Sequence, residues 1–214
     1  MNAKVMGAAA ALLLASAAQA APFQNGGFES GDDPGSYTGV SSPDSAAITG
    51  WTVYSGTIDY IGDYWTAAEG SRSVDLNGTT AGAISQTFDT VAGHVYRVSF
   101  SLAGNPDDTQ NTLKTVRVLA PTGGTPADYN FDTSDLTRGY MGWVSRTYTF
   151  TATSSSTTLS FSSLTEESAY GPAIDNVTVT DVTPTSVPTL SQWALFSLAG
   201  LLGLAALRRR GLRG

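Results

Sequence analysis

Short segments in which apolar and polar residues alternate constrain the fold of this chain more than any other feature. The clearest one runs from Val95 to Leu102 and places Tyr96, Phe100 and Leu102 on one face of an extended chain. Away from the two ends of the chain, no stretch carries an apolar period of 3.6 residues, so helices are not expected there. The sequence therefore predicts an all-β protein.

Ten such segments lie between residues 48 and 179, and turn residues separate nearly all of them. About ten strands at this spacing favour a two-sheet β-sandwich, with a jelly roll as the expected topology. The expected strands are Ile48–Tyr54, Thr57–Ile61, Ser73–Leu76, Ala83–Phe88, Val95–Leu102, Thr115–Leu119, Tyr129–Phe131, Val144–Ala152, Thr157–Phe161 and Ile174–Val179.

Composition excludes several kinds of chemistry. The chain has no Cys and one His, His94, so disulfide scaffolds, thiol catalysis and the usual zinc sites are excluded, and a bound metal would need oxygen ligands. All 18 acidic residues lie between Glu29 and Asp181 together with six basic ones, which gives this stretch a net charge of −12. Such a surface repels phosphate, so no nucleic-acid partner is expected.

The first 20 residues have the order of a secretory signal peptide. Lys4 precedes an apolar run, and Ala18-Gln19-Ala20 is a small-x-small cleavage site for signal peptidase. The mature chain would then begin at Ala21. The alternative is an N-terminal core helix.

Residues 188–214 consist of a second apolar run and a basic end. As a helix, residues 188–207 would reach roughly 30 Å, which is enough to cross a bilayer. Arg208, Arg209 and Arg210 would hold the far end in the cytoplasm, so the domain would lie outside the cytoplasmic membrane. Residues 183–187 read as a linker.

The same C-terminal region resembles the IPTL-CTERM sorting signals, which are relatives of the PEP-CTERM signals of Gram-negative bacteria. The resemblance implies an exported protein, transiently anchored by the C-terminal helix, that an exosortase-type enzyme processes for the cell surface or the exterior. A plain single-pass anchor is the alternative. The resemblance rests on Val187, where the family has Ile, and on Pro188, Thr189, Leu190 and Trp193.

Residues 21–182 resemble the choice-of-anchor C family of exported bacterial proteins. The opening Asn25-Gly26-Gly27-Phe28-Glu29, the interior Leu102 to Pro106 and the closing Gly171 to Val177 carry this resemblance. It implies a galactose-binding-like jelly roll related to plant cell-wall proteins of unknown biochemical function. Fold alone does not assign a function.

The resemblance also implies a structural calcium ion held by Glu29 of the opening motif and Asp175 of the closing motif. Carboxylates are ligands that calcium prefers, and Gly-rich turns allow carbonyl groups to converge on an ion. The alternative is that both residues are ordinary edge carboxylates or turn caps.

Aromatic residues are the candidates for contact with carbohydrate, because exposed rings stack on the apolar faces of sugars. Two clusters in Gly-containing segments stand out, although the same rings could instead plug the ends of the sandwich. The candidates are Tyr54, Tyr60 and Trp65, with Tyr64 beside them, and Tyr140 and Trp143.

No motif for catalysis is present. The chain lacks a Gly-x-Ser-x-Gly elbow and a phosphate-binding loop with Lys, and His94 lies in a turn where a capping role is expected. The sequence therefore favours a non-catalytic surface or matrix protein that binds extracellular polysaccharide. The alternatives are an adhesive protein that recognises a protein partner and a polysaccharide-active enzyme.

Overall fold

The computed structural model describes residues 21–166, 168–184, 194–199 and 202. Of these, the residues up to Val182 form one compact unit and those from Thr183 form a second. Residues 194–199 are helical, but no helix among the described residues is both long and apolar enough to cross a bilayer. The predicted signal peptide and the sorting residues Val187, Pro188, Thr189, Leu190 and Trp193 lie outside the described residues.

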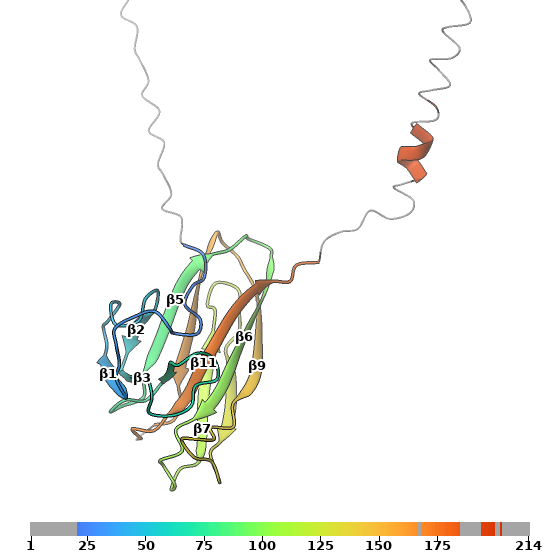
Figure 1. Ribbon diagram of the computed structural model, residues 1–214. Helices are drawn as coiled ribbons and strands as arrows, with labels where there is room; N and C mark the ends of the chain where they lie inside the picture. Colours follow the sequence, from blue (N-terminus) through green and yellow to red (C-terminus); the bar gives the residue numbers. More distant parts are fainter. Residues whose placement is uncertain (1–20, 167, 185–193, 200–201, 203–214) are drawn as a thin grey trace, which may run out of the picture. The chain divides into compact units, whose positions relative to one another are not determined.

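The first unit is a sandwich of two antiparallel sheets (Figure 1). One sheet has six strands in the order β1-β3-β4-β11-β6-β9, and the other has five in the order β2-β5-β10-β7-β8. The strands are β1 (Tyr37–Ser41), β2 (Thr52–Ser55), β3 (Thr57–Ile61), β4 (Ser73–Asp75), β5 (Ala83–Asp89), β6 (Val95–Gly104), β7 (Leu113–Leu119), β8 (Ala127–Asp132), β9 (Val144–Thr151), β10 (Ser156–Ser163) and β11 (Pro172–Asp181).

The hydrophobic core lies between the two sheets, and the period of two determines which side chains enter it. On β6, alternate residues from Tyr96 to Leu102 are buried, as the sequence predicts. Phe100 meets Phe161 of β10 edge to face, with ring centroids 5.2 Å apart. Each fully buried ring of this kind stabilises the fold by about 1.5–3 kcal/mol, so these contacts hold one sheet against the other.

All ten expected strands are present, and the structure adds β1. The sequence prediction misses this edge strand because Tyr37–Ser41 contains Gly39 and polar residues and buries only Val40. The prediction also begins β2 too early. Trp51 donates its amide to the carbonyl of Ile48 (3.0 Å) in a turn through Gly50, whose φ is +82°, so pairing starts only at Thr52.

The opening and closing segments of the domain lie side by side. The amide of Val177 donates to the carbonyl of Gly26 (2.8 Å), and a Cβ at Gly26 would come 1.8 Å from the carbonyl oxygen of Val177. Here β11 has a bulge between Asp175 and Thr178, and Asn176 takes a φ of +49°. Asp175 pairs with Ser101 of β6 just before this bulge, and alternation from the core residue Ile174 places it on the outer face of the six-stranded sheet.

Candidate functional site

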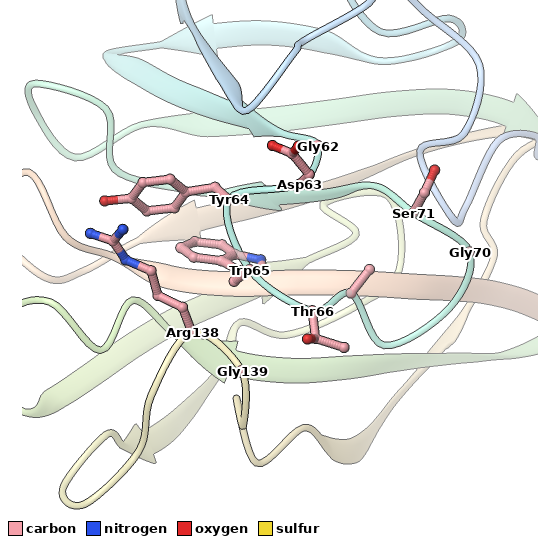
Figure 2. Close-up of a pocket in the computed structure, with 10 residues that line it drawn as sticks. Gly62, Asp63, Tyr64, Trp65, Thr66, Gly70, Ser71, Arg138 and Gly139 are labelled. Carbon is pink, nitrogen blue, oxygen red and sulfur yellow. The ribbon is translucent and has the colours of Figure 1, made fainter.

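The 62–72 loop, which connects β3 to β4, lies over the outer face of the six-stranded sheet (Figure 2). Its Trp65 is 4% exposed and donates from Nε1 to Oγ of Ser73 on β4 (2.8 Å). Trp143, just before β9, donates from Nε1 to the carbonyl of Thr66 (2.9 Å). The two indole groups therefore fix the first half of the loop.

Two carboxylates hold the second half of the loop by its backbone. Oδ2 of Asp175 accepts hydrogen bonds from the amides of Ala68 (2.8 Å) and Glu69 (2.9 Å). Oε1 of Glu29 accepts from the amides of Ser71 and Arg72, both at 2.8 Å. The opening and closing segments of the domain thus meet on one loop.

The two carboxylates have oppositely shifted acidities. Burial raises the pKa of Asp175 to about 7, although amide hydrogen bonds from Glu69, Asn176 and Ala68 oppose this shift. Burial also acts to raise the pKa of Glu29, but hydrogen bonds from Ser71 and Arg72 outweigh it and hold that pKa below its usual range. The two pKa values shift in opposite directions because Asp175 is buried more deeply than Glu29.

This arrangement does not fit a calcium ion as the residues are placed. The oxygens of Glu29 and Asp175 face N–H groups, whereas calcium takes six to eight oxygen ligands. Within the described part of the chain, no group of three or more acidic or His side chains could hold a metal. Both residues act as turn caps here, and calcium stays a prediction from the sequence resemblance.

A second loop, residues 133–143 between β8 and β9, covers the start of the 62–72 loop. Arg138 donates from Nη2 to Oδ2 of Asp107 (2.7 Å), and its guanidinium carbon lies 3.9 Å from the centre of the Tyr64 ring. Tyr64 donates its hydroxyl to the same carboxylate (2.7 Å). Burial and this contact with Asp107 raise the pKa of Tyr64 to about 12. Figure 2 shows the Tyr64, Trp65 and Arg138 side chains at this junction.

Three hollows follow the 62–72 loop in a row. The loop cavity has a volume of about 440 Å³ and is lined by Trp65, Thr66 and Ser71 among others. The tyrosine cavity of about 380 Å³ shares Tyr64 with it. The tryptophan cavity of about 460 Å³, around Tyr140 and Trp143, shares Thr66 and Gly139 with it. Their volumes are within the range of ligand sites.

Three of the five predicted carbohydrate-binding residues line this row. Tyr140 is 69% exposed and lines the tryptophan cavity beside the half-buried Trp143, while Trp65 forms the floor of the loop cavity. Tyr60 is a core residue, 1% exposed, whose hydroxyl donates to the carbonyl of Phe28, so it offers no ring face. Tyr54 lies on β2 of the other sheet and lines none of the three cavities.

The sequence prediction missed the tyrosine cavity. Asp59 lies at its base on β3, and Tyr37 lies beside it on β1. Ile58 and Tyr60 face the core, so alternation places the side chain of Asp59 on the other face of β3. This pattern could have indicated an outward carboxylate. The aromatic lining of this cavity could not be predicted, because Tyr37 belongs to β1, the strand missing from the sequence prediction.

Asp59 pairs across β3 and β4 with Asp75, and both acidities are shifted. Burial raises the pKa of Asp59 to about 6 and that of Asp75 to about 7. Asp75 is fully buried and accepts hydrogen bonds from the amides of Asn77 and Gly171 and from Nδ2 of Asn105. Cleavage of a glycosidic bond needs two carboxyl groups that both reach it, and Asp75 does not.

These shifts predict an acid-stabilised domain. The folded-state pKa values of Asp59, Asp75 and Asp175 exceed 3.8, so the native state binds more protons and stability falls as pH rises from about 4 to 7. Glu29 and Asp107 have lowered values, so their stabilisation is lost below about pH 4. We expect the melting temperature, followed by circular dichroism, to peak near pH 4 and to decrease toward pH 7. A melting temperature that increases steadily from pH 5 to pH 8 would contradict this.

The backbone contacts of Asp175 give a second prediction. Asp175→Ala leaves the amides of Ala68 and Glu69 without their acceptor and should lower the free energy of unfolding by about 1–3 kcal/mol. The exposed Asp32 provides the control Asp32→Ala, which should change it by less than about 0.5 kcal/mol. A wild-type protein that melts at the same temperature in calcium and in chelator would agree with the capping role of Asp175. A decrease in chelator that Asp175→Ala abolishes would instead establish the calcium site.

The solved structures that this chain resembles are only weakly similar to it in sequence and in structure. A carbohydrate-binding module, TmCBM61 in complex with β-1,4-galactotriose, is 19% identical with a TM-score of 0.43, covering 74% of this chain and 97% of that one. CBM35 from Paenibacillus barcinonensis is 20% identical with a TM-score of 0.42, covering 67% and 98%. Likeness at this level does not transfer a ligand from one protein to another.

Two curated relatives are more similar in sequence. Halomucin of Haloquadratum walsbyi is 36% identical over 184 residues, which are 82% of this chain and 2% of halomucin. The Arabidopsis thaliana protein DUF642 L-galactono-1,4-lactone-responsive gene 2 is 34% identical over 101 residues, which are 43% of this chain and 26% of that protein. The chain therefore spans only a small part of the length of either relative.

Two family models match the chain. The IPTL-CTERM motif matches residues 185–213, which implies an exported protein that is sorted to the surface. The model described as "Protein of unknown function (DUF642)" matches residues 21–180, which cover all of the sandwich except the last residue of β11. The choice-of-anchor C assignment stays a prediction. The chain belongs to the DUF642 family.

Proposed function

We propose that this protein is displayed outside the cell and that its β-sandwich binds polysaccharide without reacting with it. The row of three cavities along the 62–72 loop carries this proposal. Neighbouring cavities share Tyr64 on one side and Thr66 and Gly139 on the other. A ligand made of repeating units can occupy such a row with one unit in each hollow, whereas a single small molecule would fill only one of them.

The groups that line the row suit sugar. Tyr140 and Trp143 supply aromatic surface in the tryptophan cavity, and Thr66 and Ser71 supply hydroxyl groups in the loop cavity. The indole of Trp143 is already fixed by its bond to Thr66, so little conformational entropy is lost when a ligand binds there. The row therefore combines rigid rings with polar groups that orient a ligand.

The proposal is non-catalytic because the titratable groups do not assemble a reaction centre. Asp75 has no free access to the tyrosine cavity, and Asp59 is left as a single carboxyl group there. His94 contacts Asp181 through Nδ1 (2.6 Å) and lines none of the three cavities. Binding is the activity that this arrangement supports.

Binding to isolated exopolysaccharide tests the proposal. Tyr140→Ala should weaken retention of the full chain about three- to tenfold, because it removes an exposed ring from the tryptophan cavity. Tyr54→Ala is a matched control, since it removes a ring that is 45% exposed on the other sheet.

Equal retention of the wild-type protein and of Tyr140→Ala would contradict the proposal. Equal binding to intact and glycan-stripped cells would favour a protein partner instead. Release of sugar fragments from the polysaccharide would identify an enzyme.

We further propose that an exosortase-type enzyme of a Gram-negative cell reads the matched motif, and that the apolar run of residues 188–207 anchors the chain in the cytoplasmic membrane until then. The motif match and the order of motif, apolar run and arginine cluster support this. Calcium at Glu29 and Asp175 is not needed for either proposal.

The mass of the protein recovered from cells checks the processing. We expect the mature chain to begin at Ala21 and to lack the arginine cluster of residues 208–210. Replacing Pro188, Thr189 and Leu190 with Ala should leave the protein in the membrane fraction at its unprocessed C-terminal mass. Unchanged processing of that variant would show that the motif is not read.

A further inference from the structure

The tyrosine cavity is lined by a partly buried carboxylate, Asp59, whereas the acid that lines the loop cavity, Asp63, is exposed. The exposed Tyr37 and Tyr170 line it together with Asp59 of β3. Gly39 of β1 pairs with Asp59 across the two strands, and Gly78 lies on its other side. A Cβ at Gly78 would lie 3.2 Å from Oδ1 of Asp59, so the missing side chains leave room at the carboxylate.

Asp59 has no protein partner among the described residues, whereas nearby carboxylates are satisfied. Asp75 accepts three hydrogen bonds, Asp107 is held by Arg138 and Tyr64, and Asp108 is held by Lys114. Burying an ionised carboxylate without such partners is costly, and burial raises the pKa of Asp59 to about 6. Among the described residues no side chain supplies a countercharge to Asp59, so its carboxylate is left to water, a proton or a bound ligand.

The groups around Asp59 make the cavity electronegative. Asp75 pairs with Asp59 from β4 but is buried and does not line the cavity, whereas Tyr37 of β1, Tyr64 of the 62–72 loop and Tyr170 before β11 line it. Arg138 lies against Tyr64, but Asp107 already takes its guanidinium group in a two-pronged contact. Tyrosine rings attract cations, so carboxylate and rings favour the same kind of group.

We propose that the tyrosine cavity binds a sugar unit that carries a free, protonated amino group, with the ammonium on Asp59 and the sugar ring against the tyrosines. This deepens the proposed function and rests on it. A neutral hydroxyl could also donate to Asp59, but only a cation supplies the missing countercharge. The adjoining loop and tryptophan cavities then take the neighbouring units of the same polysaccharide.

The experiment compares two probes of equal length, a glucosamine oligomer with free amines and its fully N-acetylated counterpart, on the full chain at pH 7. We expect the free-amine oligomer to bind about tenfold more tightly, and Asp59→Asn to abolish that preference. Asp32→Asn is the control, because Asp32 is an exposed acid that lines none of the three cavities, so this variant should keep the preference. Asp59→Asn should also melt no lower than the wild-type protein at pH 8, since it removes an uncompensated charge.

A pH series provides an independent readout. Because ionised Asp59 is the group that binds, affinity for the free-amine oligomer should decrease as pH falls through about 6 in the wild-type protein and stay level in Asp59→Asn. Equal binding of the two oligomers, or a preference that survives Asp59→Asn, would overturn the inference. If Tyr140→Ala still weakens polysaccharide retention in that case, the proposed function stands without it.

Discussion

Four hydrogen bonds from backbone amides to two carboxylates are the contacts on which the rest of the site depends. The amides of Ala68, Glu69, Ser71 and Arg72 need acceptors when the 62–72 loop lies against the sheet, and Asp175 and Glu29 provide them. These hydrogen bonds hold residues 68–72, whereas the contacts of Tyr64, Trp65 and Trp143 hold the first half of the loop. Gly70 and Ser71 of this second half line the loop cavity, and the first half adds Tyr64 to the tyrosine cavity and Thr66 to the tryptophan cavity.

Local alternation made much of the fold predictable from the sequence. Period-two patterns mark strands such as β3 and β6 because one face of each is buried against the other sheet. The edge strand β1 escaped the prediction since only Val40 of its residues is buried. The same alternation, applied to Ile58 and Tyr60, would have assigned Tyr60 to the core and corrected its place among the sugar-binding candidates.

The site was less predictable because its chemistry depends on contacts between distant segments. Residue type alone indicated Tyr140 and Trp143, whose rings do line a cavity. The resemblance paired Glu29 with Asp175, and the two do act together, but through the amides of a third segment that no spacing in the sequence connects to them. Asp59 is distinguished by having no side-chain partner among the described residues, and no sequence motif indicates that a partner is missing.

The anchors of the 62–72 loop have a consequence for how this protein can diversify. Asp175 and Glu29 hold main-chain N–H groups, which every residue except proline possesses, and the side chains of Ala68 and Glu69 take no part in those bonds to Asp175. Substitutions there can therefore change the surface offered to a ligand while the path of the backbone persists. Two acidic side chains therefore determine the path of the loop backbone, whereas the loop side chains that a ligand would contact are free to vary.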